Sequence, residues 1–244
     1  MPKFFISATN LFGGMAYMRG KDAHHLRVLR LRPGDNVIIC EGKGMDYSCR
    51  IIASSDEEAQ LEIIDSHVCK SEPNVDVSVY CGLPKGSDRA EYIVQKSVES
   101  GANRIYFFNS KYTIAKITEQ EKKLERWNSI SEEAAKQCGR GIIPKVSWAG
   151  DYVEMLNFAN KADIKLFMYE KENNRIGIKE ALDQNPNGKS FSVITGPEGG
   201  FAEYEADIAK NLGFYICSMG NRIFRCETAP IVALSAIMYS TGNL

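Results

Sequence analysis

The chain has 244 residues, of which 44% are apolar and 25% are charged. This composition is typical of a globular protein with a sizeable core, and the length allows one large domain or two smaller ones. The 30 basic and 31 acidic side chains give a formal net charge of -1, which excludes a chain-wide attraction to nucleic acid or to membranes. Any basic surface must therefore be local.

A basic region lies at the N-terminus, where residues 1–35 carry six Lys and Arg side chains against two Asp. A short helix is expected over residues 22–31, because Pro33 and Gly34 end the helical pattern. Its polar side carries four candidate binding residues, His24, His25, Arg27 and Arg30. The two histidines do not indicate a metal site, since neighbours on a helix point about 100° apart and nothing completes a ligand set.

Short β-branched runs follow this helix and are separated by turn segments rich in Gly, Ser and charged residues. They lie at residues 37–40, 47–52 and 60–65. Three such runs at close spacing predict a small antiparallel β-barrel.

The pattern changes after a polar, linker-like stretch at residues 71–74. From there apolar runs, expected to form strands, alternate with segments expected to form helices. The runs lie at residues 75–81, 104–108, 145–148, 164–169, 191–195 and 214–218. The helical segments lie near residues 89–100, 118–138, 151–160, 176–183, 203–212 and 228–240. This alternation predicts an α/β domain with a mostly parallel sheet covered on both faces, and domains at 1–72 and 73–244.

Seven cysteines are scattered through the chain without a C-x-x-C spacing. An odd and dispersed set indicates reduced thiols rather than disulfides or a zinc site. The N-terminus lacks a long apolar segment, and no run approaches the ~20 apolar residues of a membrane span. We therefore expect a cytoplasmic protein with no membrane and no metal partner.

A glycine-rich turn, Thr195-Gly-Pro-Glu-Gly-Gly-Phe201, follows one apolar run and precedes a helical segment. In open α/β sheets ligands bind at such turns, at the carboxyl ends of the strands. Glu198 inside the turn opposes an anion, and the sequence has neither of the usual phosphate-binding glycine motifs. A dinucleotide or a nucleoside triphosphate is thus disfavoured, and a tight turn with no ligand stays an alternative.

A second turn, Ser218–Pro230, follows the next apolar run. Thr228 is a candidate helix N-cap, and Pro230 is tolerated in the first turn because its missing N–H has no partner there. Arg222, Arg225 and Glu227 then lie where the two turns could converge on one pocket. An Arg–Glu pair that only closes the helix N-terminus is the structural alternative.

Residues 194–201, followed by residues 219–229, resemble the two C-terminal signatures of RsmE-type methyltransferases of the SPOUT class. Three further stretches are similar in the same order, at residues 24–35, 85–101 and 134–140. The chain departs from the usual pattern only in details, at Met219, Cys226 and Pro230. Members of this family methylate N3 of a uridine in bacterial 16S ribosomal RNA, using S-adenosylmethionine.

The resemblance implies a PUA-like RNA-binding β-barrel, followed by a trefoil-knotted domain whose chain passes through an earlier loop from about residue 214 onward. It implies a homodimer that acts on 16S ribosomal RNA or on the small ribosomal subunit. It implies cofactor contacts from Thr195, Gly196, Pro197, Glu198, Gly199, Gly200, Met219, Gly220, Ile223, Phe224 and Arg225. It also implies RNA contacts from His24, His25, Arg27, Arg30, Lys85, Lys96, Gln137 and Arg140.

The catalytic assignment follows from the chemistry of uracil, whose N3 carries a proton at neutral pH. Attack on the methyl group needs removal of that proton or stabilisation of the anion. Glu227 is the candidate base and Arg225 the candidate anion stabiliser, while Lys85, Lys96 and Arg140 are alternatives or phosphate contacts. Two other functions remain open: a module that only binds RNA through the basic N-terminal region, and a nucleotide-binding regulator, which the missing phosphate motifs oppose.

Overall fold

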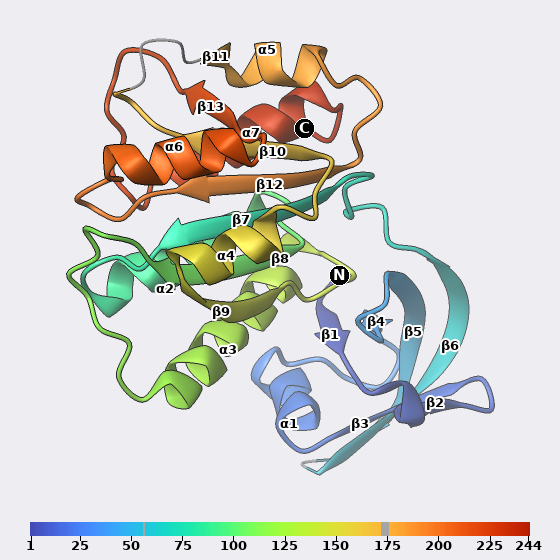
Figure 1. Cartoon of the computed structure of the whole chain (residues 1–244). Helices are drawn as coiled ribbons and strands as arrows, with labels where there is room; N and C mark the ends of the chain where they lie inside the picture. The colour runs from blue at the N-terminus through green and yellow to red at the C-terminus, as the bar shows by residue number, and fades with distance from the viewer. Residues whose placement is uncertain (56, 172–175) are drawn as a thin grey trace. The chain divides into compact units, whose positions relative to one another are not determined.

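The structure, a computed structural model, describes residues 1–55, 57–171 and 176–244 (Figure 1). It divides into unit 1, Met1–Glu72 with Ala135–Ile143, and unit 2, Pro73–Ala134 with Pro144–Leu244. Residues 135–143 thus group with unit 1, and the expected domains at 1–72 and 73–244 stay a prediction. No helix in the described part of the chain is long and apolar enough to cross a membrane.

Unit 1 contains a curled six-stranded sheet with the strand order β1-β4-β5-β6-β3-β2. Its strands are β1 (Lys3–Phe5), β2 (Leu11–Phe12), β3 (Met15–Arg19), β4 (Asn36–Cys40), β5 (Met45–Ser54) and β6 (Glu58–Val68). The pairing is antiparallel as predicted, except that β1 runs parallel to β4. The sequence analysis found the last three strands and missed the first three.

Helix α1 (Lys21–Val28) covers the core of unit 1 by burying Ala23 and Leu26. The helix ends three residues before the predicted end because Arg30 has a left-handed backbone, with a φ of 58°. Such a conformation cannot continue a right-handed helix. The four candidate binding residues of this region are exposed: His24, His25 and Arg27 on α1, and Arg30 just after it.

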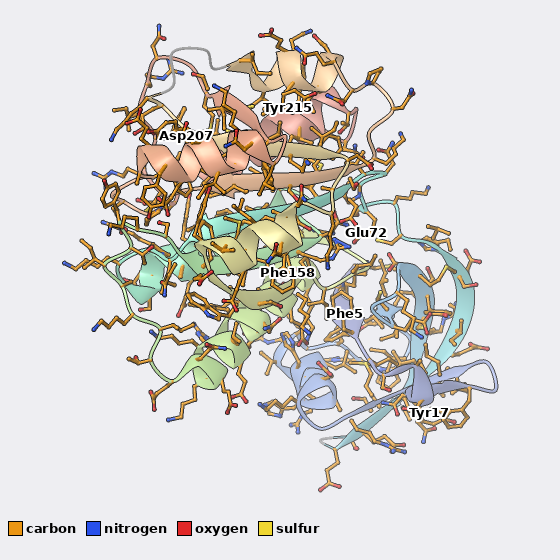
Figure 2. The ribbon with its side chains drawn as sticks, in the orientation of Figure 1. Phe5, Tyr17, Glu72, Phe158, Asp207 and Tyr215 are labelled. Carbon is orange, nitrogen blue, oxygen red and sulfur yellow. The ribbon has the colours of Figure 1, made fainter. Side chains whose placement is uncertain are left out.

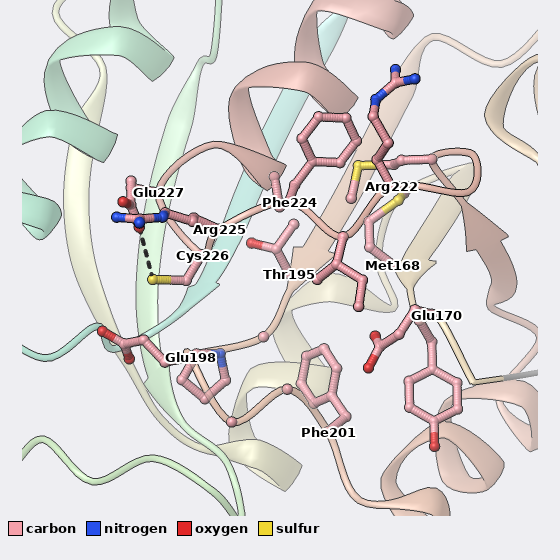
Figure 3. A pocket seen from close by; sticks show the side chains of 18 of the residues that line it. Met168, Glu170, Thr195, Glu198, Phe201, Arg222, Phe224, Arg225, Cys226 and Glu227 are labelled. Atoms are coloured by element: carbon pink, nitrogen blue, oxygen red, sulfur yellow. Dashed lines mark hydrogen bonds between the residues drawn. The ribbon is translucent and has the colours of Figure 1, made fainter.

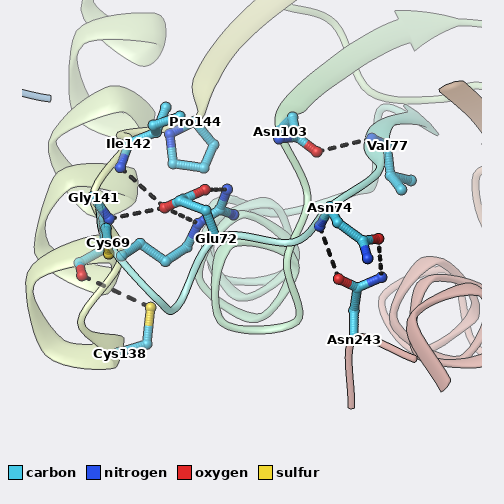
Figure 4. Close-up of polar contacts among 12 residues, drawn as sticks. Cys69, Glu72, Asn74, Val77, Asn103, Cys138, Gly141, Ile142, Pro144 and Asn243 are labelled. Atoms are coloured by element: carbon cyan, nitrogen blue, oxygen red, sulfur yellow. Dashed lines mark hydrogen bonds and ion pairs between the residues drawn. The ribbon is translucent and has the colours of Figure 1, made fainter. Parts of the chain in front are cut away.

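The segment 135–143 is held in unit 1 by the carboxylate of Glu72 (Figure 4). This carboxylate accepts hydrogen bonds from the backbone N–H of Gly141, at 2.8 Å, and of Ile142, at 3.0 Å. It also forms an ion pair of 2.7 Å with Arg140, whose side chain is only 3% exposed. A partly buried carboxylate with three such partners fixes the path of the segment.

Unit 2 is built on a seven-stranded sheet in which every recorded pair is parallel, in the order β11-β13-β10-β12-β7-β8-β9. Its strands are β7 (Asp76–Gly82), β8 (Arg104–Asn109), β9 (Lys145–Asp151), β10 (Ile164–Met168), β11 (Ile176–Gly177), β12 (Ser190–Thr195) and β13 (Tyr215–Ser218). Strand β10 lies between β12 and β13, so the turns that follow these three strands meet at one edge of the sheet.

The helices of unit 2 are α2 (Ser87–Glu99), α3 (Gln120–Cys138, whose last four residues belong to unit 1), α4 (Tyr152–Ala159), α5 (Ile178–Asp183), α6 (Glu203–Asn211) and α7 (Ala229–Ser240). On one face of the sheet, α4 and α6 pack on an aromatic core that includes Phe167 and Phe201. The outer sides of these two helices carry exposed residues such as Phe158 and Asp207 (Figure 2). Helix α7 contacts β7, β12 and α2. The predicted α/β architecture is confirmed.

Candidate active site

A cavity of about 570 Å³ lies at the carboxyl ends of β10, β12 and β13. It is formed by the ends of three strands and the turns that follow them, at residues 168–170, 195–201 and 217–229 (Figure 3). The sequence predicted two of these three segments. The segment Met168–Glu170 was missed because only the strand order shows that β10 ends between the other two strands.

The structure brings together all eleven residues that the resemblance assigned to a cofactor, since each of them lines this cavity. Of the two candidate catalytic residues, Arg225 is one of these eleven, and Glu227 lines the cavity as well. Arg89, near the start of α2, is a further lining residue that the sequence analysis did not identify. No sequence signal marks Arg89, because its position depends on how α2 docks against the turn 195–201.

The turn 195–201 is docked by the close approach of Pro197 to Gly82, the last residue of β7. A Cβ atom at Gly82 would overlap the ring of Pro197. Within the turn, a Cβ at Gly199 would lie 2.7 Å from the Cβ of Tyr112, which is too close for unaltered packing. These glycines therefore allow tight packing of the turn.

Gly220 in the second turn has a different role. Its φ of 93° lies in the left-handed region, and nothing lies within 4 Å of the place where a Cβ would stand. The glycine is thus needed for the backbone conformation rather than for space.

Glu198 connects the turn 195–201 to the start of α2. Its carboxylate accepts a 2.9 Å hydrogen bond from the backbone N–H of Lys85 and pairs with the guanidinium of Arg89. Burial opposes the charge of Glu198, but these hydrogen bonds hold the pKa of its carboxyl below the ordinary value. The negative charge of Glu198, which disfavours an anionic ligand, is therefore balanced by Arg89.

Glu227 accepts a hydrogen bond from the thiol of Cys226, with Sγ and Oε2 3.2 Å apart (Figure 3). Burial, reinforced by that hydrogen bond, raises the pKa of Cys226 to about 12, so the thiol stays protonated and can donate. Although burial alone would raise the pKa of Glu227, its hydrogen bonds and the charges of Arg89 and Arg225 lower it. Glu227 is thus an ionised carboxylate at neutral pH.

The arginines of the second turn are exposed, and neither Arg222 nor Arg225 forms an ion pair with the residues that the structure describes. The structural alternative of an Arg–Glu pair at the helix N-terminus therefore finds no support. Thr228 occupies the N-cap position of α7, but its side chain makes no capping hydrogen bond, and Pro230 lies in the first turn.

The candidate RNA-contacting residues are divided between the two units. Gln137 in unit 1 and Lys85 in unit 2 are exposed, whereas Lys96 is paired with Glu99 at 2.8 Å. Arg140 is buried, and its guanidinium is held by Glu72. This guanidinium forms an ion pair within unit 1, and its contact with RNA stays a prediction.

Among the residues outside positions 56 and 172–175, no group of three or more His, Cys, Asp and Glu side chains could hold a metal ion.

Comparison with known proteins first defines the class. Residues 71–238 match the model of the RNA methyltransferase domain family, and residues 19–64 match that of the RNA methyltransferase PUA domain. The turn-lined cavity at the carboxyl edge of a parallel sheet thus belongs to an RNA methyltransferase domain, and the curled sheet of unit 1 contains the match to a PUA domain.

The relatives define the family more narrowly. The chain is 32% identical to the ribosomal RNA small subunit methyltransferase E of Bacillus subtilis, over 92% of this chain and 90% of that protein. It is 33% identical to the protein of the same name from Mesomycoplasma hyopneumoniae, over 87% and 88%. The solved structure of the Neisseria gonorrhoeae enzyme, bound to S-adenosyl methionine, has 30% identity and a TM-score of 0.87, covering 98% of each chain. The chain belongs to this family of ribosomal RNA small subunit methyltransferases E, which confirms the resemblance seen in the sequence.

Proposed function

We propose that this protein transfers a methyl group from S-adenosylmethionine to N3 of a uridine in the 16S RNA of the small ribosomal subunit. The observation that carries the proposal is the convergence of the eleven candidate cofactor residues, Arg225 among them, with Glu227 on one cavity. Family membership supports the substrate class, since the relatives are named for the RNA of the small subunit.

The cavity fits the cofactor. Its volume of about 570 Å³ lies within the range of ordinary small-molecule sites. Met219, Ile223 and Arg225 would hold the adenine through backbone groups, and Gly196–Gly199 would lie near the ribose. When bound, S-adenosylmethionine supplies a methyl group made electrophilic by a positively charged sulfur. The glycine turn suits this ligand because it packs closely and Arg89 already balances Glu198.

Glu227 and Arg225 would act on the uracil. Because the pKa of Glu227 is lowered, its carboxylate is ionised and can accept a hydrogen bond from N3–H as that proton leaves toward solvent. The neutral thiol of Cys226 keeps this carboxylate oriented. Arg225 is exposed and without an ion pair in the described part of the chain, so its guanidinium can turn toward a carbonyl oxygen of the base.

We also propose the knotted, SPOUT-type path for the chain from about residue 214 onward, with the cavity formed by the exposed turns of the knot. The parallel sheet and the family support this proposal. A protein that only binds RNA would need unit 1 alone and would leave the cavity of unit 2 without a ligand.

The cofactor proposal is tested by calorimetry with two matched glycine variants. Wild type should bind one S-adenosylmethionine per chain. In Gly82→Ala the new methyl group displaces Pro197 and the turn, and affinity should fall by at least about tenfold, or about 1.4 kcal/mol. The control Gly177→Ala adds the same methyl group in open space and should bind as wild type does. A folded Gly82→Ala protein with unchanged affinity would reject the placement of the cofactor.

The role of Glu227 is tested by single-turnover methylation of small-subunit particles between pH 6 and 9. Glu227→Gln should be more than about tenfold slower at pH 7, within the usual range for general-base help. The deficit should shrink as pH rises, because the imide then ionises without assistance. Glu125→Gln, an exposed carboxylate of α3, is the control and should follow wild type. A profile parallel to wild type would make Glu227 a structural residue and move the search for the base to Lys85 or Lys96.

The RNA contact of unit 1 is tested by charge reversal at two arginines, one on α1 and one just after it. The double variant Arg27→Glu/Arg30→Glu should weaken binding to 16S RNA and lower the salt slope by about two, one for each phosphate contact. Its affinity for S-adenosylmethionine should not change. Lys122→Glu/Lys179→Glu makes the same charge change at two highly exposed sites of unit 2 and is the control. Equal RNA binding by both double variants would remove α1 from the RNA contact.

The homodimer is proposed from α7, which is apolar on all sides. Ile231, Val232 and Ala236 stay only partly covered and Tyr239 is 77% exposed, so the helix needs a further partner surface. Sedimentation at micromolar concentration should give about twice the chain mass of 27.2 kDa. A species of the single-chain mass would contradict the dimer.

A further inference from the structure

Arg89 is the third guanidinium of the cavity and lies near the start of α2. We propose that Arg89 donates to a carbonyl oxygen of the target uracil and stabilises its N3 anion, while Glu198 holds Arg89 in position. The inference rests on the proposed methyl transfer to uridine and deepens it. It makes Arg89 a catalytic residue, and it changes the role of Glu198 from a cofactor contact to a positioning residue.

The side chain of Arg89 is held by an ion pair and still has N–H donors that can bind a ligand. One terminal nitrogen of its guanidinium pairs with Oε1 of Glu198, the same oxygen that accepts the N–H of Lys85. A guanidinium has five N–H donors in a rigid fork. The donors that do not contact Glu198 can therefore bind another acceptor while the ion pair stays formed. The Arg89 side chain is 40% exposed, which leaves it open to an incoming base.

The charge of Arg89 reaches the groups that face the reacting base. It is one of the charges that lower the pKa of Glu227, and it opposes the rise in the pKa of Cys226 caused by burial. Glu198, Cys226 and Glu227 line the same cavity as Arg89. A uracil nitrogen presented to Glu227 therefore lies within the field of this guanidinium.

The chemistry requires such a group because Glu227 is a weak base. In the transfer, the N3 electron pair forms the new bond to the methyl carbon, and the bond from that carbon to sulfur breaks with its pair left on sulfur. The N3 proton leaves through Glu227 to solvent. Negative charge that develops on N3 is shared with the two carbonyl oxygens of the ring, where a fixed N–H donor stabilises it.

Arg89 differs from Arg225 in being preorganised. The side chain of Arg225 is exposed and makes no ion pair with the described residues, so ordering it against the base has an entropic cost. Arg89 is already ordered by Glu198, and a donor held before the reaction is more effective than one that must be recruited. Arg225 can still turn toward the base as proposed above, but Arg89 is the donor that is already in place.

The test compares Arg89→Gln with Arg126→Gln. Arg126 also forms an ion pair from one helix to α2, with Glu91 at 3.0 Å, but it does not line the cavity, so its loss is a matched control. Single-turnover methylation of small-subunit particles is measured at pH 6–9, and S-adenosylmethionine affinity is measured separately by calorimetry. Arg89→Gln should be about a hundredfold slower at pH 7, which is typical of losing one anion-stabilising donor. The pH at which its methylation rate rises should be higher than in wild type, because the bound imide is less acidic without the guanidinium.

Two readouts distinguish stabilisation of the uracil anion by Arg89 from a role of Arg89 in anchoring the turn 195–201. Affinity for S-adenosylmethionine should stay within about threefold of wild type in Arg89→Gln, a difference of less than 1 kcal/mol. Small-subunit particles rebuilt with 5-fluorouridine have a more acidic imide. They should increase the methylation rate of Arg89→Gln by a larger factor than that of wild type. If Arg89→Gln does not fold, Arg89→Lys, which keeps the charge but loses the fork, should show the same pattern in weaker form.

The contrary outcomes are distinct. An unchanged rate in Arg89→Gln, or equal losses of rate and cofactor affinity, would overturn the role of Arg89 and leave the proposed function intact. Slow methylation by the control Arg126→Gln would show that any lost ion pair on α2 has the same effect, and would also overturn it. A wild-type protein that binds S-adenosylmethionine but methylates no uridine would reject the proposed function itself, and the inference with it.

Discussion

The close contact between Gly82 and Pro197 is the constraint on which the rest of the site depends. Because Gly82 has no side chain, the turn after β12 can lie directly against the end of β7, from which the chain continues into α2. That approach puts Glu198 within reach of the Lys85 N–H and of Arg89. A side chain at position 82 would push the turn 195–201 away from β7. The cavity would then lose this part of its lining and the ion pair that orders Arg89.

The charges of the cavity are arranged around this contact. The lining holds Arg89, Arg222 and Arg225 against Glu170, Glu198 and Glu227, so it carries no net formal charge. A neutral lining suits a cofactor with a sulfonium and a carboxylate better than it suits a phosphate ligand. In the proposed reaction, Arg89 would stabilise the negative charge that develops on the uracil, and Glu227 would accept its N3 proton.

The sequence predicted the segments of the site well but not how they are assembled. The turns at 195–201 and 218–230 follow strong apolar runs, so their position at strand ends could be read from the pattern alone. Met168–Glu170 and Arg89 were missed because their place depends on the order of strands and on the packing of α2, which no local pattern encodes. Of the first three strands of unit 1, β1 and β2 have only three and two residues, and β1 and β3 pair with strands that lie far away along the chain. The sequence does not show that Arg140 is buried, because arginine is usually exposed and the carboxylate that compensates its burial, Glu72, lies far away along the chain.

The central claim is methyl transfer to N3 of a uridine, and it is tested most directly by following a labelled methyl group. Small ribosomal subunits that lack the modification are incubated with the protein and isotopically labelled S-adenosylmethionine, and the RNA is then digested to nucleosides and separated by mass spectrometry. The account predicts that the label appears as N3-methyluridine in 16S RNA. Label found only on a ribose oxygen or on another base, or no label in RNA while the protein binds the cofactor, would contradict it.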